Sequence, residues 1–341
     1  MNLREELAQI IDAVAILSPY AFTFAGQPSG TLAMPMMGVQ IAPGMPPLMG
    51  ELINQLYQHC FSTRFAGQIE KSEPPRSEPD PAWLETLSRA NQGCDRWEDG
   101  WLAVHGMPNG QIVAKRGAET RILGPGEFVN VTGSGMFLPP NTALRVFLPH
   151  ESRTMQPGFY FVFGETPGDS SDQLSVIRFY WNVPAEGAPR LLELLSVAMN
   201  RWQVPFHFKT GVYPAMLARR DSAVLYVSRR YADIANELVR DVHGQMRQLL
   251  REDVPLFTLR LAEGLAFAED PGSQESFGMA RCRMLAGGIW LAHQRGARQS
   301  SERLAAVAEH FHSEGVSLER PWLNRGSADD LAFAGGRAEA A

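Results

Sequence analysis

Two short segments of the chain, RFYWN and PFHFK, alternate aromatic side chains with polar or titratable ones. Successive side chains of a strand point to opposite faces, so Arg178 and Tyr180 share one face of the first segment. By the same rule His207 and Lys209 share one face of the second segment. Either segment alone is more often the surface of an edge strand. Two of them in one chain weaken that interpretation and make both polar faces candidates for a functional site.

A basic cluster flanks the apolar run SAVLYV, with Arg219 and Arg220 before it and Arg229 and Arg230 after it. Arginine guanidinium groups match phosphate oxygens in pairs, which makes the cluster a candidate anion site. Acidic side chains lie close by in the sequence, however, and such charges commonly form ion pairs on a solvated face. Charge alone therefore favours ion pairing over phosphate binding.

A third set of charged side chains lies in AEDPGSQESFGMARCR, which contains Asp270, Arg281 and Arg283. Ser276 or Glu275 could begin a helix there, and the free amides of its first turn could bind an anion or be capped by a side chain. Capping is the commoner use of such amides.

These side chains need a sheet to hold them. From about residue 98 the chain is a series of short apolar runs divided by turns rich in Gly, Pro, Asn and Asp, which predicts β-strands. Helical spacing predicts helices at 2–17, 50–66, 186–203, 231–252 and 275–296. The expected fold is α+β, with a mixed or antiparallel sheet flanked by helices and a helical N-terminal region.

The composition and residue pattern of the sequence divide the chain into three parts. Residues 1–97 are expected to form a helical N-terminal region for substrate or leader recognition, with the proline-rich segment KSEPPRSEPDP as a linker or exposed loop. Residues 98–324 are expected to form the α+β domain that carries the chemistry. Residues 325–341 are expected to be a disordered tail.

Bulk properties exclude several classes of protein. A formal net charge of −6 and a pI near 5.8 argue against broad binding to nucleic acid or to anionic membranes. The apolar run near the N-terminus is interrupted by acidic residues, so it is a poor signal peptide, and no stretch has the length of a membrane span. Three scattered cysteines without CxxC spacing indicate reduced thiols. We therefore expect a soluble cytoplasmic protein.

Several motifs in order resemble the HopA-type effector domain: VIRFYWNVPAEGAPRLLELL, VPFHFKTGVYP, RRDSAVLYVSRRY, VPLFTLRLAEGLAFAEDPG and ESFGMARCRMLAGGIWLA. The resemblance covers roughly residues 125–297. Members of that family resemble the lyases of class V lanthipeptide and thioamitide biosynthesis, which work beside a separate phosphotransferase-like kinase. The resemblance thus implies a phosphorylated ribosomal precursor peptide as substrate and a kinase as partner.

The same domain is distantly similar to the phosphothreonine lyases of the OspF and SpvC kind. The similarity implies that Lys209 is the catalytic base and that Arg220 and Arg281 bind phosphate, and Arg178 and Tyr180 match the spacing of the first strand pair in those enzymes. Arg178, Arg219 and Asp270 complete the expected substrate-binding set. Those lyases have a histidine as proton donor, where this chain has Tyr180. The general acid is therefore open: Tyr180 could serve, His207 could serve, or the phosphate could leave without protonation.

The implied reaction is β-elimination of phosphate, which leaves dehydroalanine or dehydrobutyrine in a peptide. A lysine with an ordinary pKa near 10.4 is a poor base, so the pKa of Lys209 must fall to about 7–8. Neighbouring guanidinium groups and aromatic packing would lower it by repulsion and desolvation, and the same guanidinium groups would hold the leaving phosphate. The reaction needs no cofactor and no metal.

Two other classes of function compete with this one. A non-catalytic module that binds a phospho-peptide or a leader peptide would keep the arginines without the acid, and Tyr180 favours it slightly. A type III effector acting on a host protein is the third hypothesis. The histidines lack metal-ligand spacing, and Cys282 lies within a predicted helix, where a core position is more common than a nucleophile.

Overall fold

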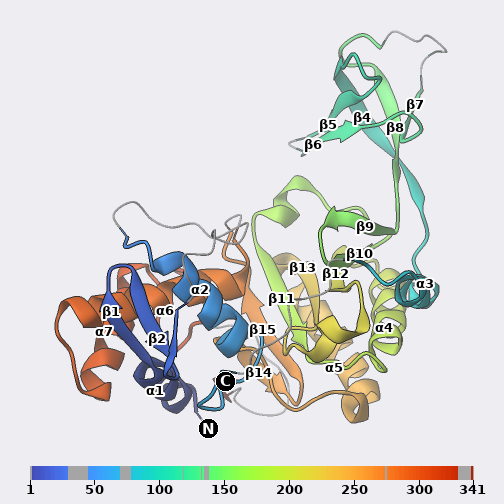
Figure 1. Cartoon of the computed structure of the whole chain (residues 1–341). Helices are drawn as coiled ribbons and strands as arrows, with labels where there is room; N and C mark the ends of the chain where they lie inside the picture. The colour runs from blue at the N-terminus through green and yellow to red at the C-terminus, as the bar shows by residue number, and fades with distance from the viewer. Residues whose placement is uncertain are drawn as a thin grey trace.

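The computed structural model describes residues 2–29, 45–69, 78–117, 119–131, 133, 138–272, 275–328 and 339–340. The chain folds into helices and three antiparallel sheets, which confirms the expected α+β fold and its N-terminal helix (Figure 1). Most of the predicted proline-rich linker and most of the predicted C-terminal tail lie outside the described residues.

The N-terminal region contains strands as well as helices. Helix α1 (Leu3–Ala13) begins with a reciprocal cap, in which the Asn2 side chain accepts from the Glu5 amide and the Glu5 carboxylate accepts from the Asn2 amide. The prediction of a helix to residue 17 is wrong at its end, because the chain enters strand β1 at Val14. An apolar run such as VAIL fits a buried strand as well as a helix, so spacing could not separate the two. The remaining elements are β1 (Val14–Ser18), β2 (Ala21–Phe24), β3 (Gln27–Pro28), α2 (Met49–Leu56), the π-helix η1 (Tyr57–Phe61) and α3 (Pro81–Ala90).

An eight-stranded antiparallel sheet forms the centre of the body, in the order β16-β14-β15-β11-β13-β12-β10-β9. Its strands are β9 (Glu151–Gln156), β10 (Phe159–Phe163), β11 (Val176–Trp181), β12 (Phe206–Gly211), β13 (Ala223–Ser228), β14 (Leu259–Ala262), β15 (Leu265–Glu269) and β16 (Glu339–Ala340). The N-terminal elements share one hydrophobic core with this sheet, because Leu7, Ile53 and Phe179 belong to the same buried cluster.

Long helices cover both faces of the sheet. The three predicted helices of the body are present as α4 (Ala188–Arg201), α5 (Ala232–Met246) and α6 (Phe277–Gln294), and a further helix, α7 (Ser300–Ser313), packs on α6. Short 3₁₀ turns complete the body: η2 (Ser170–Gln173), η3 (Pro214–Ala218), η4 (Arg229–Tyr231) and η5 (Arg247–Leu249). Helix α5 covers one face, where the rings of His243 and Trp181 lie 6.3 Å apart. Helix α6 and η1 cover the opposite face, where Phe277 and Phe61 pack on Tyr180.

A small five-stranded sheet projects from the body on two long strands, and we call residues 96–148 the arm (Figure 1). Its strands are β4 (Arg96–Gly106), β5 (Ile112–Arg116), β6 (Glu119–Leu123), β7 (Phe128–Asn130) and β8 (Ala143–Leu148). The arm has a separate hydrophobic core around Trp101. At its base Asp95, just before β4, accepts hydrogen bonds from the amide of His150 at 2.9 Å and from Nδ1 of its ring at 2.5 Å. The chain therefore enters and leaves the arm at one point.

Candidate active site

The strand register confirms the two faces predicted from the sequence and places them side by side. Lys209 of β12 lies opposite Val224 of β13, and Val224 lies opposite Tyr180 of β11. Directly opposed residues of an antiparallel sheet point to the same face, so Lys209 and Tyr180 share one face, about 10 Å apart at their Cα atoms.

The next row of the same face holds the other two candidates. His207 lies opposite Tyr226, and Tyr226 lies opposite Arg178. We call the four polar residues of these two rows the sheet-face site: Arg178, Tyr180, His207 and Lys209. The tyrosine between them, Tyr226, was not singled out from the sequence, although it lies in the predicted strand two residues after Val224.

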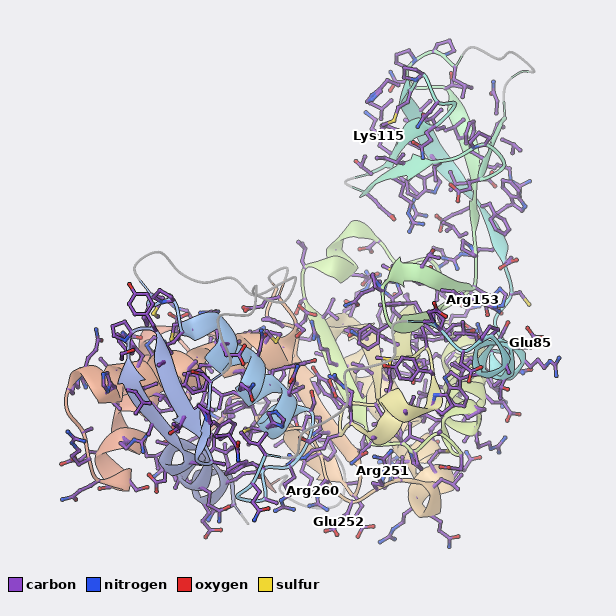
Figure 2. The ribbon with its side chains drawn as sticks, viewed as in Figure 1. Glu85, Lys115, Arg153, Arg251, Glu252 and Arg260 are labelled. Carbon is purple, nitrogen blue, oxygen red and sulfur yellow. The ribbon has the colours of Figure 1, made fainter. Side chains whose placement is uncertain are left out.

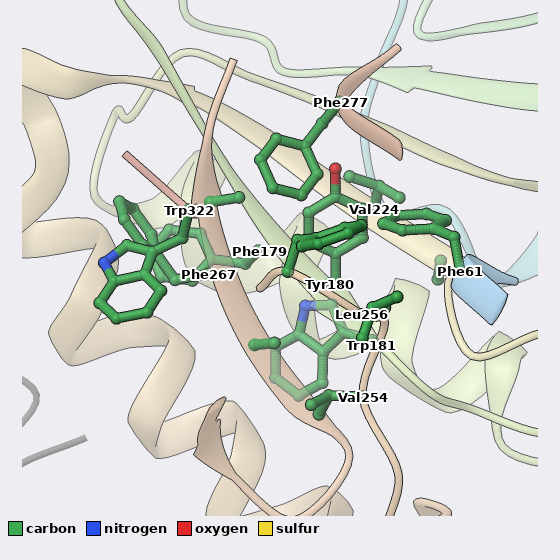
Figure 3. Close-up of a cluster of buried hydrophobic side chains, with 14 of the residues drawn as sticks. Phe61, Phe179, Tyr180, Trp181, Val224, Val254, Leu256, Phe267, Phe277 and Trp322 are labelled. Carbon is green, nitrogen blue, oxygen red and sulfur yellow. The ribbon is translucent and has the colours of Figure 1, made fainter. Parts of the chain in front are cut away.

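Tyr180 is buried against aromatic rings, as Figure 3 shows. The ring of Phe61 meets it edge-on at 6.3 Å, and the ring of Phe277 lies 6.1 Å away. Burial raises the pKa of Tyr180, and the charge of Arg178 opposes that rise. Tyr180 therefore keeps its proton at neutral pH and can donate a hydrogen bond, but it is a weak acid.

Arg178 is 8% exposed and already holds an anion. Its Nε donates to Oδ2 of Asp270 at 2.8 Å, and its Nη2 donates to the same oxygen. Its guanidinium carbon lies 5.1 Å from the centre of the Tyr226 ring. Burial disfavours the charge, but the oxygens of Tyr180, Tyr226 and Asp270 outweigh burial and raise the pKa of Arg178. This group is a permanent cation placed for an anion.

Arg281 lies in α6 and is 1% exposed. Its guanidinium donates to the carbonyl oxygens of Pro321 at 2.6 Å and Leu323 at 3.0 Å. Burial, together with the nearby cations Arg283 and Arg178, lowers the pKa of Arg281 to about 10. The guanidinium carbon of Arg281 lies 4.8 Å from the centre of the Phe277 ring, which packs on Tyr180.

Arg220 and Arg219 are tied to the N-terminal region. Buried Arg220 donates to the Glu6 carboxylate of α1 at 3.2 Å and to the carbonyl oxygen of Val254 at 2.9 Å. Arg219 forms two hydrogen bonds with Asp221 and a third, of 2.8 Å, with the hydroxyl of Tyr57. These contacts give both arginines internal partners in place of the expected phosphate.

Lys209 contacts aromatic rings and an amide. Its Nζ lies 4.0 Å from the centre of the Phe159 ring, 5.9 Å from that of Phe161 and 3.5 Å from Oε1 of Gln156. Lys209 thus lies on the same sheet face as Arg178, whereas Arg220 and Arg281 form hydrogen bonds with other parts of the chain.

Among the titratable groups of the sheet-face site, His207 is the one whose charged form is most clearly disfavoured. Burial, reinforced by the cations Arg121 and Arg96, lowers the pKa of His207 to about 4. The ring of Phe163 meets the imidazole edge-on at 5.3 Å. His207 is therefore neutral at pH 7 and has no imidazolium proton to give, which weighs against it as the general acid. Both of these cations come from the arm, and their approach to this row could not be predicted from the sequence.

The described ranges of the chain contain neither a cluster of metal-binding side chains nor a membrane-spanning helix. Within them, no three histidine, cysteine, aspartate or glutamate side chains gather as a metal site. No helix among the described residues combines the length and the apolar character that crossing a bilayer requires.

The geometry defines a class of protein: an α+β body whose large sheet has a polar face that carries an arginine. Residues 150–323, which run from the base of the arm to the segment after α7, match the model of the HopA1 effector protein family. The match spans just over half of the chain, and the protein belongs to this family.

Two solved structures of effector proteins are also similar to the chain. One, from Pseudomonas syringae pv. tomato strain DC3000, has 17% identity and a TM-score of 0.43, with 81% of this chain and 96% of that chain covered. The other, from Pseudomonas syringae pv. syringae strain 61, has 16% identity and a TM-score of 0.42, with 81% and 89% covered. No curated protein sequence matches the chain.

Proposed function

We propose that this member of the HopA1 family is a phosphoserine/phosphothreonine lyase. It would eliminate phosphate from a phosphorylated ribosomal precursor peptide and leave dehydroalanine or dehydrobutyrine. The observation that supports this most is the shared sheet face, where Lys209 lies in one row with Tyr180 while Arg178 lies in the next row. A base, a hydrogen-bond donor and a fixed cation thereby face the same side.

Each of these three groups has one role in the proposed reaction. Lys209, in its neutral form, takes the α-proton of the phosphorylated residue, and the electron pair forms the Cα–Cβ double bond as the Cβ–O bond breaks. Phosphate leaves with the electrons of that bond. Arg178 stabilises the growing negative charge, and the neutral hydroxyl of Tyr180 donates a hydrogen bond to it. Because Tyr180 and His207 are both unsuited to giving up a proton at pH 7, we infer that the phosphate leaves unprotonated.

Asp270 has a distinct part in this proposal. It holds the Arg178 guanidinium through a single carboxylate oxygen, which fixes the fork of the arginine in place. A phosphate dianion carries more charge than a carboxylate and competes for the same donors. Arg281 adds a second cation beside Tyr180, whereas Arg220 serves the proposal by anchoring helix α1.

A second candidate is a non-catalytic module that binds phospho-peptides. One observation favours it: the Lys209 ammonium lies on the ring of Phe159, a contact that a cation makes and that a base must leave. A host protein is a further candidate substrate, since the family is named for effectors. A separate kinase is the partner that the lyase proposal requires, because the substrate must arrive phosphorylated.

Incubation with phosphothreonine and phosphoserine peptides separates these functions. A lyase removes the elements of phosphoric acid and leaves an alkene that adds thiols, so mass spectrometry should show that loss and then a thiol adduct. Release of phosphate with intact threonine would mean hydrolysis instead. Binding without any change of mass would support the non-catalytic module.

A further inference from the structure

The arm is fixed against the end of the large sheet by two arginines. Arg96 of β4 donates through Nη1 to the carbonyl oxygen of Gly164 at 2.5 Å, and Arg116 of β5 donates through Nη2 to the carbonyl oxygen of Gly168 at 3.2 Å. Gly164 directly follows Phe163, which lies opposite His207 in the sheet. The base of the arm therefore lies beside the His207 row.

The arginines at this end of the arm are held in ordered positions. The guanidinium carbons of Arg116 and Arg121 lie 5.3 Å and 5.5 Å from the centre of the buried Trp101 ring. Glu98 pairs with Arg116 at 2.8 Å, and Glu119 pairs with Arg121 at 2.7 Å. Contacts between guanidinium groups and an indole keep a cation in place without burying it.

Arg121 and Arg96 retain donors for a ligand. The Arg121 side chain is 43% exposed, and in the described part of the chain its carboxylate partner, Glu119, is bound through Nε. Nε of Arg96 is shielded from solvent and has no hydrogen-bond acceptor among the described residues. A buried donor without an acceptor costs about 1–3 kcal/mol, so a movement of the Arg96 side chain that brings Nε to an anion at the surface would remove that cost.

The distance between the arm arginines and Arg178 sets the length of a peptide that could contact both. Arg96 reaches Gly164, which follows the Phe163 that lies opposite His207. Arg121 contacts the same Trp101 ring as Arg116, whose guanidinium binds Gly168. In keeping with this placement, the charges of Arg121 and Arg96 contribute to the lowered pKa of His207. His207 lies two strands from Arg178 in the same row, which is about 10 Å. An extended peptide advances about 3.3 Å per residue, so about three residues span the distance from Arg178 to His207, beside which the base of the arm lies.

We propose that Arg121 and Arg96 of the arm bind an anionic side chain, a carboxylate or a second phosphate, about three residues from the phosphorylated residue held at the sheet-face site. This inference rests on the proposed function, because it takes the substrate to be a phosphorylated peptide. It makes the arm a specificity-determining part of the protein. Peptides with acidic residues near the reacting one are the substrates it favours.

Fluorescence polarisation with labelled phosphothreonine peptides tests the proposal. Glutamate, phosphoserine or alanine is placed three residues before or after the phosphothreonine, and the full-length protein is titrated. The glutamate peptide should bind about tenfold tighter than the alanine peptide, with the glutamate either before or after the phosphothreonine. The phosphoserine peptide shows which anion is preferred. Equal affinities for all peptides would overturn the proposal.

Variants assign the effect to the arm. Arg121→Gln should abolish the preference for glutamate, whereas Arg145→Gln should keep it, because Arg145 is an exposed arm arginine paired with Asp99 at 3.0 Å. Arg121→Glu should favour a lysine peptide over the glutamate peptide, a reversal that misfolding cannot produce. A preference that survives in Arg121→Gln would refute the role of the arm.

Mass spectrometry of the same mixtures keeps the two proposals apart. Elimination from every peptide with no dependence on Arg121 would leave the lyase standing and reject the arm site. An Arg121-dependent preference without elimination would support the arm site and reject the lyase.

Discussion

Lys209 and Tyr180 lie in one row of the large sheet, each directly opposite Val224 of the strand between them. The two residues are 29 positions apart in the sequence, and only the antiparallel register of β12, β13 and β11 brings them to one face. Their environments differ: Tyr180 is buried under Phe61 and Phe277, whereas Lys209 lies partly exposed over Phe159. This contrast suits the roles proposed for them, a buried hydrogen-bond donor and a base that must receive a proton.

Replacing Lys209 with alanine is expected to lower the rate of elimination by about 10²–10⁴-fold, the usual contribution of a general base. Affinity for a phospho-peptide should change little, because the proposed phosphate contact belongs to Arg178. The matched control is Lys115→Ala, which removes an exposed lysine of the arm (Figure 2). Single-turnover kinetics and a binding titration check both expectations. Full activity in Lys209→Ala would exclude it as the base.

The ion pair between Arg220 and Glu6 is expected to hold helix α1 on the body. Both side chains are below 10% exposed, so Arg220→Ala leaves a buried carboxylate without its cation and should lower the free energy of unfolding by about 3–5 kcal/mol. The exposed pair of Arg4 and Glu319 supplies the comparison, and Arg4→Ala should cost about 0–1 kcal/mol. Urea unfolding measures both. Similar losses for the two variants would contradict a structural role for Arg220.

A methyl group at Gly278 is expected to disturb the aromatic cover of Tyr180. A Cβ there would lie 2.5 Å from the ring of Phe61, so Gly278→Ala should destabilise the protein by about 1–3 kcal/mol. Gly244 lies in helix α5 with no atom within 4 Å of such a Cβ, and Gly244→Ala should instead stabilise by up to about 1 kcal/mol. Thermal unfolding compares the two helices. The double variant Gly278→Ala with Phe61→Leu should recover part of the loss if contact with the ring is the cause.

Protonation of His207 is expected to destabilise the fold at acidic pH. The pKa of His207 is lowered to about 4 by burial and by Arg121 and Arg96, whereas an unfolded histidine titrates near 6.5. Between these values the unfolded chain binds a proton that the folded chain excludes. The stability contributed by His207 is therefore complete above about pH 6.5 and falls as the pH drops towards 4, by about 1–3 kcal/mol because the imidazole is partly exposed.

Denaturant unfolding at pH 7.5 and pH 4.5 measures this effect. The wild-type protein should lose more stability between the two pH values than His207→Gln does, and the difference cancels the carboxylates that both proteins share. His105→Gln, at an exposed arm position, should behave as the wild type. An identical pH dependence in the wild type and His207→Gln would mean that His207 titrates normally.

The two polar faces could be predicted from the sequence because alternation in a strand is a local property. RFYWN and PFHFK fix which side chains point together whatever the strands pair with. The rows could not be predicted, because the register between β11, β13 and β12 is set by contacts between distant segments. The alternation in Arg178–Tyr180–Asn182 is therefore visible in the sequence, while the neighbourhood of Tyr226 is not.

The partners of the arginines were the least predictable part of the site. Arg220 finds Glu6 across 214 positions of sequence, and Arg281 finds carbonyl oxygens 40 and 42 positions away. Side-chain charge gives no sign of such distant backbone acceptors. The separate core of the arm was hidden for a similar reason, because the strands of 98–148 alternate in the same way as those of the body.

The bond between Asp95 and His150 makes the arm a self-contained insertion. The chain enters the arm after Asp95 and leaves it before His150, and hydrogen bonds join these two residues. A chain so arranged can lengthen, shorten or exchange that segment without rethreading any strand of the large sheet. The body that carries the sheet-face site and the arm can therefore change in sequence independently of each other.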